Sequence, residues 1–270
     1  MVIQHRLKLA LVCLLGLIWG GVIMPGMAIA RELPADQGSV AVQSLQPYFD
    51  RVTQQVTEFR LGNGMTFIVL ERHQAPVISF LTYADVGGAD EPDGKTGVAH
   101  FLEHMAFKGT RRIGTTNYSK EQQLLALLDQ LDAQMRAAKA MGDETKRAAL
   151  ATEFARVKAD ANRLIKQNEF GQIVERYGGV GLNANTSTDA TRYFYSFPAN
   201  KLELWMSLES ERFLEPVFRE FYEEKAVILE ERRMQVDNSP TGQLFIAMME
   251  AAFQRHPYRR PVIGYVQDLE

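Results

Sequence analysis

Residues 97–107 read GVAHFLEHMAF and place two histidines and a glutamate within one short segment. On a helix, side chains four positions apart lie on the same face, so His100 and His104 can both reach one metal ion, a common way to build a zinc site. Glu103 projects near the same side, where it could hold a water and take its proton. The order His-x-x-Glu-His inverts the His-Glu-x-x-His zinc motif. The segment therefore predicts a metal centre, against the plainer alternative of an amphipathic helix with a solvated surface.

A catalytic zinc needs a third protein ligand and an open position. The only cysteine, Cys13, lies in an amino-terminal segment that we expect to be removed, so a carboxylate is favoured as the third ligand. The predicted helix at 221–235, FYEEKAVILEERRMQ, offers two pairs of glutamates, each pair seven residues apart. The pairs are Glu224 with Glu231, and Glu223 with Glu230. Helical spacing does not choose between them, and an acidic helix of this kind is often only a solvated, salt-bridged face.

The amino-terminal thirty residues differ in character from the rest of the chain. Two basic residues precede an apolar run, Leu9–Ile23, and the small-residue site Ala28-Ile29-Ala30 follows. This order predicts a secretory signal peptide at residues 1–30, cleaved after Ala30, with retention as a membrane anchor as the alternative. The apolar run is short for a bilayer span, so we expect an exported protein, periplasmic or secreted, with no stable membrane span after cleavage. Residues 31–55 form a lead-in segment.

The composition is that of a globular protein. The chain has 270 residues, of which 46% are hydrophobic and 23% charged, enough to bury a sizeable core. The formal net charge is −3 and no long basic block is present, so nucleic acid is not expected as a partner.

Strand patterns lie on both sides of the metal motif. Residues 59–72 alternate apolar side chains around Asn63-Gly64 and predict a β-hairpin. Further strands are predicted within 77–87 and 178–198, and Thr96 is expected to cap the helix that carries the histidines. Strands and helices are mixed without a regular βα alternation, so the fold class is α+β, with a mixed or antiparallel sheet and packed helices.

The longest helical pattern covers residues 119–167. Leucines and other apolar residues recur there at helical spacing on both sides of Gly142, which predicts a helical hairpin that turns at this glycine. Helical patterns resume at 201–214, continue after Pro216 through the acidic helix, and end with a helix from about Gln243 to Phe253.

Four segments in this order resemble the pitrilysin/insulinase family of zinc peptidases, which includes the mitochondrial processing peptidases. They are GVAHFLEHMAFKGT (97–110), GGVGLNANTSTDATRYFY (178–195), EKAVILEERRMQVDNSP (224–240) and HPYRRPVIGY (256–265). The resemblance covers most of residues 56–270. It implies that His100, His104 and Glu231 bind one zinc ion, that Glu103 is the general base and that Glu224 supports the metal site. It also implies that Asn183 and Ala184 lie on the strand edge that receives an extended peptide.

The resemblance further implies the function and the partners. The chain is expected to be the amino-terminal part, incomplete at its carboxyl end, of an exported zinc endopeptidase that cuts peptides or unfolded proteins. Family members need a second half, in the same polypeptide or as a separate subunit, and residues 119–167 form an insertion relative to many of them. The alternative is a truncated, non-catalytic relative that binds metal and peptide but needs a second half for turnover.

Overall fold

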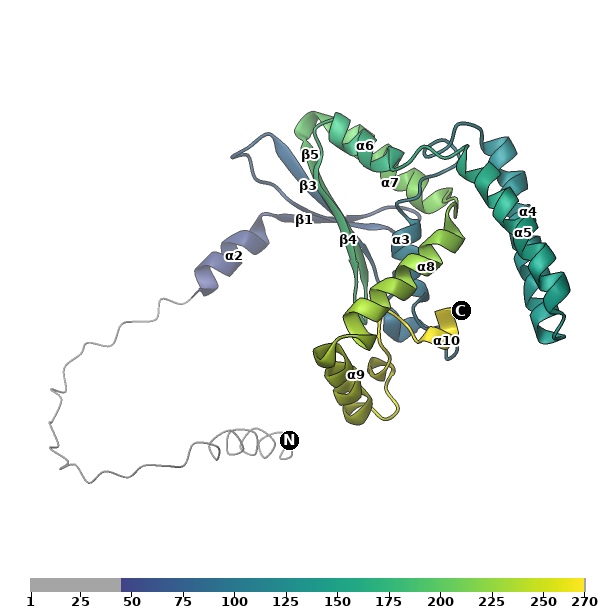
Figure 1. The fold of residues 1–270 in the computed structure, drawn as a ribbon. Coiled ribbons are helices and arrows are strands. Elements are labelled where there is room, and N and C mark those ends of the chain that lie inside the picture. The colour runs from purple at the N-terminus through teal and green to yellow at the C-terminus, as the bar shows by residue number, and fades with distance from the viewer. Residues whose placement is uncertain (1–44, 270) are drawn as a thin grey trace, which may run out of the picture. The chain divides into compact units, whose positions relative to one another are not determined.

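The computed structural model describes residues 45–269, which fall into two compact units (Figure 1). One unit ends at Glu71 and the other begins at Arg72, and each is described by itself. The predicted signal peptide, residues 1–30, lies outside the described residues, as does the lead-in segment up to residue 44.

The described residues of the first unit, from residue 45 on, form one helix and the predicted hairpin. Helix α2 (Gln46–Gln54) precedes strands β1 (Val56–Arg60) and β2 (Thr66–Leu70), which pair antiparallel. Phe59 lies opposite Phe67, and their rings stack with centroids 5.1 Å apart. Gly64 has a φ of 93°, a conformation that favours glycine, so the Asn63-Gly64 signal correctly marked the turn.

The second unit is built on a three-stranded antiparallel sheet. Its strands are β3 (Val77–Ala84), β4 (Val180–Thr186) and β5 (Thr191–Pro198), in the order β3-β5-β4. The α-helices are α3 (Val98–Met105), α4 (Tyr118–Ala140), α5 (Glu144–Asn162), α6 (Glu169–Arg176), α7 (Leu202–Leu214), α8 (Phe221–Arg232), α9 (Pro240–Ala252) and α10 (Val266–Leu269). Short helical turns are η1 (Gly88–Asp90), η2 (Ala199–Lys201), η3 (Arg233–Asp237) and η4 (Pro257–Arg259). This arrangement confirms the α+β class.

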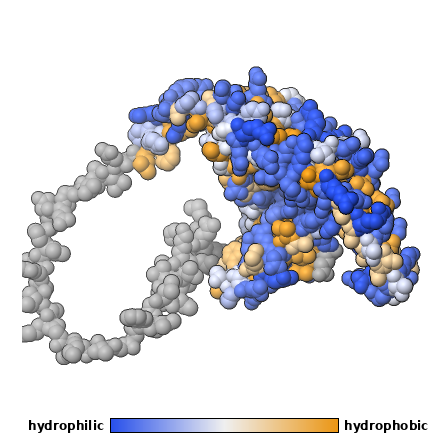
Figure 2. All heavy atoms as spheres, turned by 45° about the horizontal axis from the view of Figure 1, so that its top comes forward, coloured by the Kyte–Doolittle hydropathy of each residue, from blue (hydrophilic) through white to orange (hydrophobic). Residues whose placement is uncertain are grey.

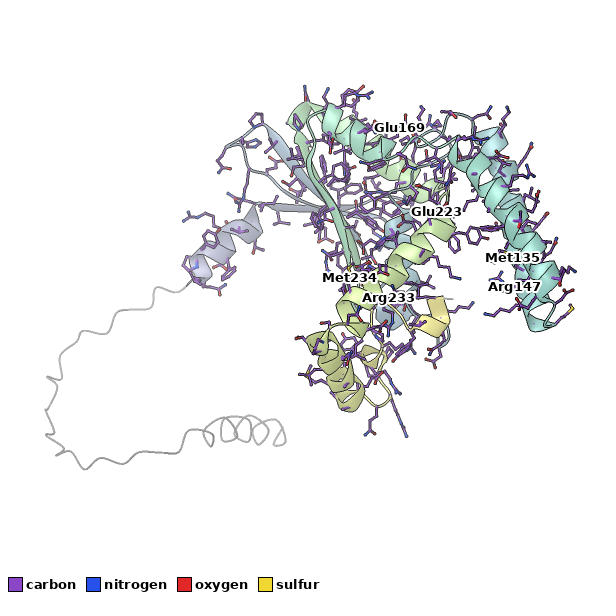
Figure 3. The ribbon with its side chains drawn as sticks, in the orientation of Figure 1. Met135, Arg147, Glu169, Glu223, Arg233 and Met234 are labelled. Atoms are coloured by element: carbon purple, nitrogen blue, oxygen red, sulfur yellow. The ribbon has the colours of Figure 1, made fainter. Side chains whose placement is uncertain are left out.

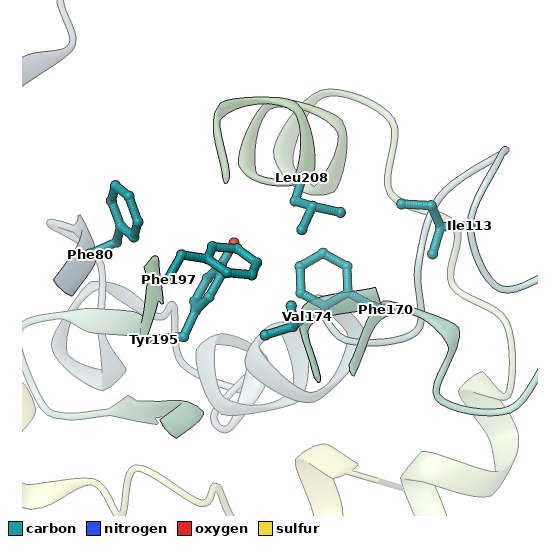
Figure 4. Packing of buried hydrophobic residues seen from close by; sticks show 7 residues of the cluster. All are labelled: Phe80, Ile113, Phe170, Val174, Tyr195, Phe197 and Leu208. Carbon is teal, nitrogen blue, oxygen red and sulfur yellow. The ribbon is translucent and has the colours of Figure 1, made fainter. Parts of the chain in front are cut away.

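The main core lies between β5 and the helices α6 and α7 (Figure 4). Side chains of β5 are alternately buried and half-buried, so one face of the strand supplies Tyr195 and Phe197 to the core. The other members are Phe80, Ile113, Phe170, Val174 and Leu208. Short helix α6 was not predicted, although it contributes two of these residues.

Helices α4 and α5 form the predicted helical hairpin. A separate core of Leu128, Leu131, Val157 and Ala161 holds them together, and Gly142 in the turn has a φ of 70°. Figure 1 shows the pair extending away from the sheet, and Figure 3 labels Met135 and Arg147 toward its free end. The apolar stripes read from the sequence therefore pack against each other.

A buried ion pair joins the base of this hairpin to the rest of the unit. Arg219 and Glu121 each have 1% of their side chain exposed, and Arg219 Nε donates to Glu121 Oε1 at 2.8 Å. The guanidinium also donates to the carbonyls of Lys108 (2.5 Å), Thr110 (2.7 Å) and Ile113 (2.9 Å). One side chain thus fixes α4, the loop after α3 and the approach to α8.

That loop needs glycine because it wraps closely around the guanidinium. Gly109 and Gly114 have φ values of 95° and 90°, and a Cβ at either would lie within 2.8 Å of Arg219 Nη1. The helical pattern expected after Pro216 does not form a helix until Phe221, because Glu220 adopts a φ of 57° and breaks the helical path.

Replacement of Arg219 by leucine should lower the free energy of unfolding by about 3 to 5 kcal/mol, because Glu121 would stay buried without a countercharge. The matched control is Glu215→Gln, which breaks an exposed pair with Arg111 at 4.0 Å and should cost no more than about 1 kcal/mol. Urea denaturation of both variants measures the difference. Equal midpoints would show that the buried pair does not anchor the hairpin.

Candidate metal centre

Helix α3 carries the predicted histidines, and a buried glutamate fixes its first turn. Glu91 accepts hydrogen bonds from the backbone of Gly97 (2.8 Å) and Ala99 (2.7 Å), and its burial raises the pKa of its carboxyl. The prediction that Thr96 caps this helix was wrong. Gly97 is the capping position, with a φ of 89°, and the Thr96 hydroxyl donates to Asp268 at 2.5 Å instead.

The structure brings His100, His104 and Glu231 together. Their ligand atoms all lie within 4.8 Å of one another. Glu231 Oε2 is 3.5 Å from His104 Nε2 and 3.8 Å from His100 Nε2. Zinc–nitrogen and zinc–oxygen bonds of about 2.0 to 2.2 Å in a tetrahedron place ligand atoms roughly 3.3 to 3.6 Å apart. The two carboxylate–imidazole distances are close to this spacing, and two imidazoles with a carboxylate are a ligand set that suits zinc.

Helix α8 supplies the carboxylates, and its packing distinguishes the two pairs that spacing left open. Glu224 and Glu231 face α3. Glu223 instead contacts the hairpin, through Lys158 (3.4 Å) and Asn162 (3.1 Å), as its position in Figure 3 shows. Glu230 pairs with Arg233 and is 52% exposed. Only the first pair can serve the metal centre.

Glu224 lies behind His104, on the side of the ring away from Glu231. Its Oε2 is 3.1 Å from His104 Nδ1, and its other oxygen pairs with Lys108. The hydrogen bond to Glu224 raises the pKa of His104. Burial acts to raise the pKa of Glu224, but the hydrogen bonds from His104 and Lys108 outweigh it and leave that pKa lowered. Glu224 thus stays charged and fixes the tautomer that presents His104 Nε2 to the metal.

His100 is held differently. Its burial is the main reason that its pKa is lowered, and the neighbouring His104 lowers it further. Its Nδ1 is buried and has no hydrogen-bond partner among the described residues. The two rings meet edge to face with centroids 4.8 Å apart. The imidazole of His100 is therefore neutral, as a metal ligand must be.

Glu103 stands beside these ligands without joining them. Its Oε2 accepts a hydrogen bond of 2.6 Å from the hydroxyl of Thr186, at the end of β4. Asn183 and Ala184 lie on the same strand, and Asn183 Oδ1 accepts from the backbone of Ala184 at 2.9 Å. β4 is an edge of the three-stranded sheet and packs against α3. The structure therefore places all seven predicted residues on α3, α8 and β4.

Lys108 is a further residue of this site that the sequence patterns did not predict. Its Nζ contacts Glu224 and lies 3.2 Å from Glu220 Oε2. Although its burial opposes the change, the two glutamates raise its pKa. Lys108 follows His104 by four residues but lies beyond the end of α3 at Met105, so helical spacing does not place it and its role depends on contacts with Glu220 and Glu224.

A model of the insulinase family, peptidase family M16, matches residues 67–147 and 162–265, more than half of the chain. The chain belongs to the insulinase family. The resemblance read from the sequence is thereby confirmed. The interruption of the match lies within α5, in the helical hairpin.

Relatives of this family are longer than the chain. The zinc protease PqqE of Helicobacter pylori is 29% identical over 235 residues, which cover 86% of this chain and 39% of the relative. Protease 3 of Salmonella typhimurium is 32% identical over 89 residues, covering 32% of this chain and 9% of its own length. A crystal structure of a protease from Helicobacter pylori matches with a TM-score of 0.57 at 28% identity, covering 79% of this chain and 39% of that one. The chain spans about two-fifths of the length of these Helicobacter pylori proteins.

Glu231→Ala removes one of the three metal ligands. It should therefore weaken zinc binding more than loss of a residue that only supports a ligand, which costs roughly 10- to 100-fold in affinity. Its neighbour provides the control, since Glu230→Ala removes an exposed carboxylate that points away and should leave the affinity unchanged. Competition with a chromophoric chelator measures both. Equal losses in the two variants would contradict the assignment.

Glu223 and Glu224, which are neighbours on α8, allow a test of whether Glu224 supports His104 as a metal ligand. Glu224→Ala should weaken zinc binding about 10- to 100-fold, whereas Glu223→Ala, which loses contacts to the hairpin, should not. The same competition assay applies. If Glu224→Ala binds zinc with unchanged affinity, Glu224 does not support the metal site.

Proposed function

We propose that this chain is the metal-binding half of an exported zinc endopeptidase that hydrolyses peptides or unfolded proteins. The observation that carries the proposal is the convergence of His100, His104 and Glu231, with the carboxylate of Glu103 beside them. Membership of a family that includes zinc proteases supports the choice of metal and reaction. One ion is expected, because the three ligand atoms form one cluster.

The chain's own residues can carry out proton transfer. Zinc held by these ligands would lower the pKa of a water molecule and polarise the carbonyl of a peptide bond. The charge of Glu103 interacts with both His100 and His104, but Glu103 is not in the ligand cluster, so its carboxylate can take the proton of the attacking water and give it to the leaving amine. Glu224 keeps His104 oriented during this exchange.

The position of β4 suggests how a substrate would bind. An edge strand has backbone groups that an extended peptide can pair with, a mode called β-augmentation. Asn183 and Ala184 lie on this edge strand, which packs against the helix that carries Glu103. A peptide paired with β4 would therefore pass close to Glu103 and the metal ligands.

The other parts of the proposal concern the cell and the partner. We propose that residues 1–30 direct export, to the periplasm or outside the cell, and that residues 56–270 act with a second insulinase-type half. The greater length of the relatives supports such a half. Among residues 45–269, no helix is both long and apolar enough to span a membrane, and the surface in Figure 2 is mostly hydrophilic.

Glu103→Gln should abolish peptide hydrolysis, with a loss of at least about 100-fold, and should leave zinc binding unchanged because Glu103 is not in the ligand cluster. The assay is cleavage of a quenched fluorescent peptide by the chain, alone and mixed with candidate second halves, together with zinc content by plasma mass spectrometry. Zinc binding with no hydrolysis under either condition would support the non-catalytic alternative. A protein that binds no zinc would contradict both.

A further inference from the structure

The hydrogen bond between Thr186 and Glu103 joins segments 83 positions apart at the metal centre, and its length of 2.6 Å is that of a strong hydroxyl–carboxylate bond. We propose that Thr186 is a positioning residue, whose hydroxyl holds one oxygen of the Glu103 carboxylate so that the other faces the reacting water. This inference rests on the proposed function of Glu103 as general base.

The strand ladder fixes the position of Thr186. Leu182, Ala184 and Thr186 are the half-buried residues of β4, and exposed residues alternate with them. Thr186 lies directly opposite Thr191 of β5, whose hydroxyl donates to Val86 O at 3.0 Å and lies 3.4 Å from Thr186 Oγ1. The Thr186 hydroxyl is 2.6 Å from the Glu103 carboxylate and 3.4 Å from the Thr191 hydroxyl, so Glu103 is the acceptor of its proton.

The turn after Thr186 is held from both sides. The backbone N–H of Gly88 donates to Ser187 O at 3.2 Å, and a Cβ at Gly87 would lie 2.4 Å from that oxygen. The hydroxyl of Tyr258 donates to the carboxylate of Asp189, with oxygen–oxygen distances of 2.8 and 2.9 Å. Contacts on two sides therefore hold the end of β4, and with it the Thr186 hydroxyl, in place.

A glutamate that acts as a base needs a fixed hydrogen-bond partner to hold its carboxylate in one geometry. Its side chain has several rotatable bonds, and a base must lie within hydrogen-bond distance of the proton that it takes. With Oε2 held by Thr186, the carboxylate has one oxygen left to accept that proton. The competing explanation is that the bond only fastens α3 to the sheet, and the experiments separate the two.

The first experiment measures the contact without catalysis. Thr186→Val, Glu103→Ala and the double variant of the full chain are unfolded in urea. If the bond is formed, the unfolding equilibrium constant of the double variant should differ by about tenfold or more from the value that the two single substitutions predict when their effects are combined independently. Coupling below about twofold would overturn the proposal, because the two side chains would then not interact.

The second experiment measures the role in the reaction. In the peptide-cleavage assay, Thr186→Val should lower kcat about 10- to 100-fold with KM and zinc content unchanged, because the base is misplaced while substrate and metal still bind. Thr186→Ser keeps the hydroxyl and should restore kcat to within about threefold.

The control is Thr82→Val. It removes another threonine hydroxyl–carboxylate bond of the same sheet, 2.7 Å to Glu209, away from the metal centre. If loss of kcat comes only from a weakened sheet, Thr82→Val will lower kcat as Thr186→Val does, and the positioning role is overturned. If the wild-type protein cleaves the peptide and Thr186→Val cleaves it with the same kcat, the positioning role of Thr186 is overturned and the proposed function stands. A wild-type protein without cleavage, in which the stability coupling is present, overturns the proposed function and leaves the contact between Thr186 and Glu103 established.

Discussion

The buried guanidinium of Arg219 is the constraint on which the metal centre depends. It donates to the carboxylate of Glu121 and to three carbonyls of the loop that leaves α3, and it lies two residues before α8 begins. Helices α3 and α8 are more than 110 residues apart in sequence, yet both must deliver side chains to one point. Because Arg219 holds the end of one and the approach to the other, histidines and glutamates far apart along the chain meet within 4.8 Å.

Charge balance is the second condition. Glu224 and Glu220 would repel each other and Glu231 if they stood alone, and Lys108 lies between the first two. This arrangement keeps Glu224 ionised, so its bond to His104 Nδ1 persists and Nε2 points to Glu231. Within residues 45–269 no group forms a hydrogen bond with Nδ1 of His100, and burial lowers the pKa of its ring. The two histidines of the motif are thus equivalent in the sequence but not in the structure.

Local rules predicted what depends on local spacing. The separation of His100 and His104 by four residues, and the apolar stripes of the helical hairpin, followed from the helical repeat. The choice of Glu231 over Glu230 did not, because both recur at the same spacing and only the packing of α8 on α3 separates them. Threonine is a common capping residue, but in the structure the Thr96 hydroxyl donates to Asp268, and Glu91 accepts from the backbone at the start of the helix. The roles of Thr186 and Lys108 depend on long-range contacts of the same kind.

The helical hairpin shows why the metal site can tolerate a long intervening segment. The hairpin follows Thr115 and ends before Ile165, and these two residues pair in an antiparallel bridge. Thr116 N also donates to Leu164 O at 2.8 Å, so the two ends of the segment meet regardless of its length. The hairpin also has a core of its own, to which both of its helices contribute. The family match is interrupted at residues 148–161 of α5, and Thr115 and Ile165, where the two ends of the segment meet, both lie within the matched residues.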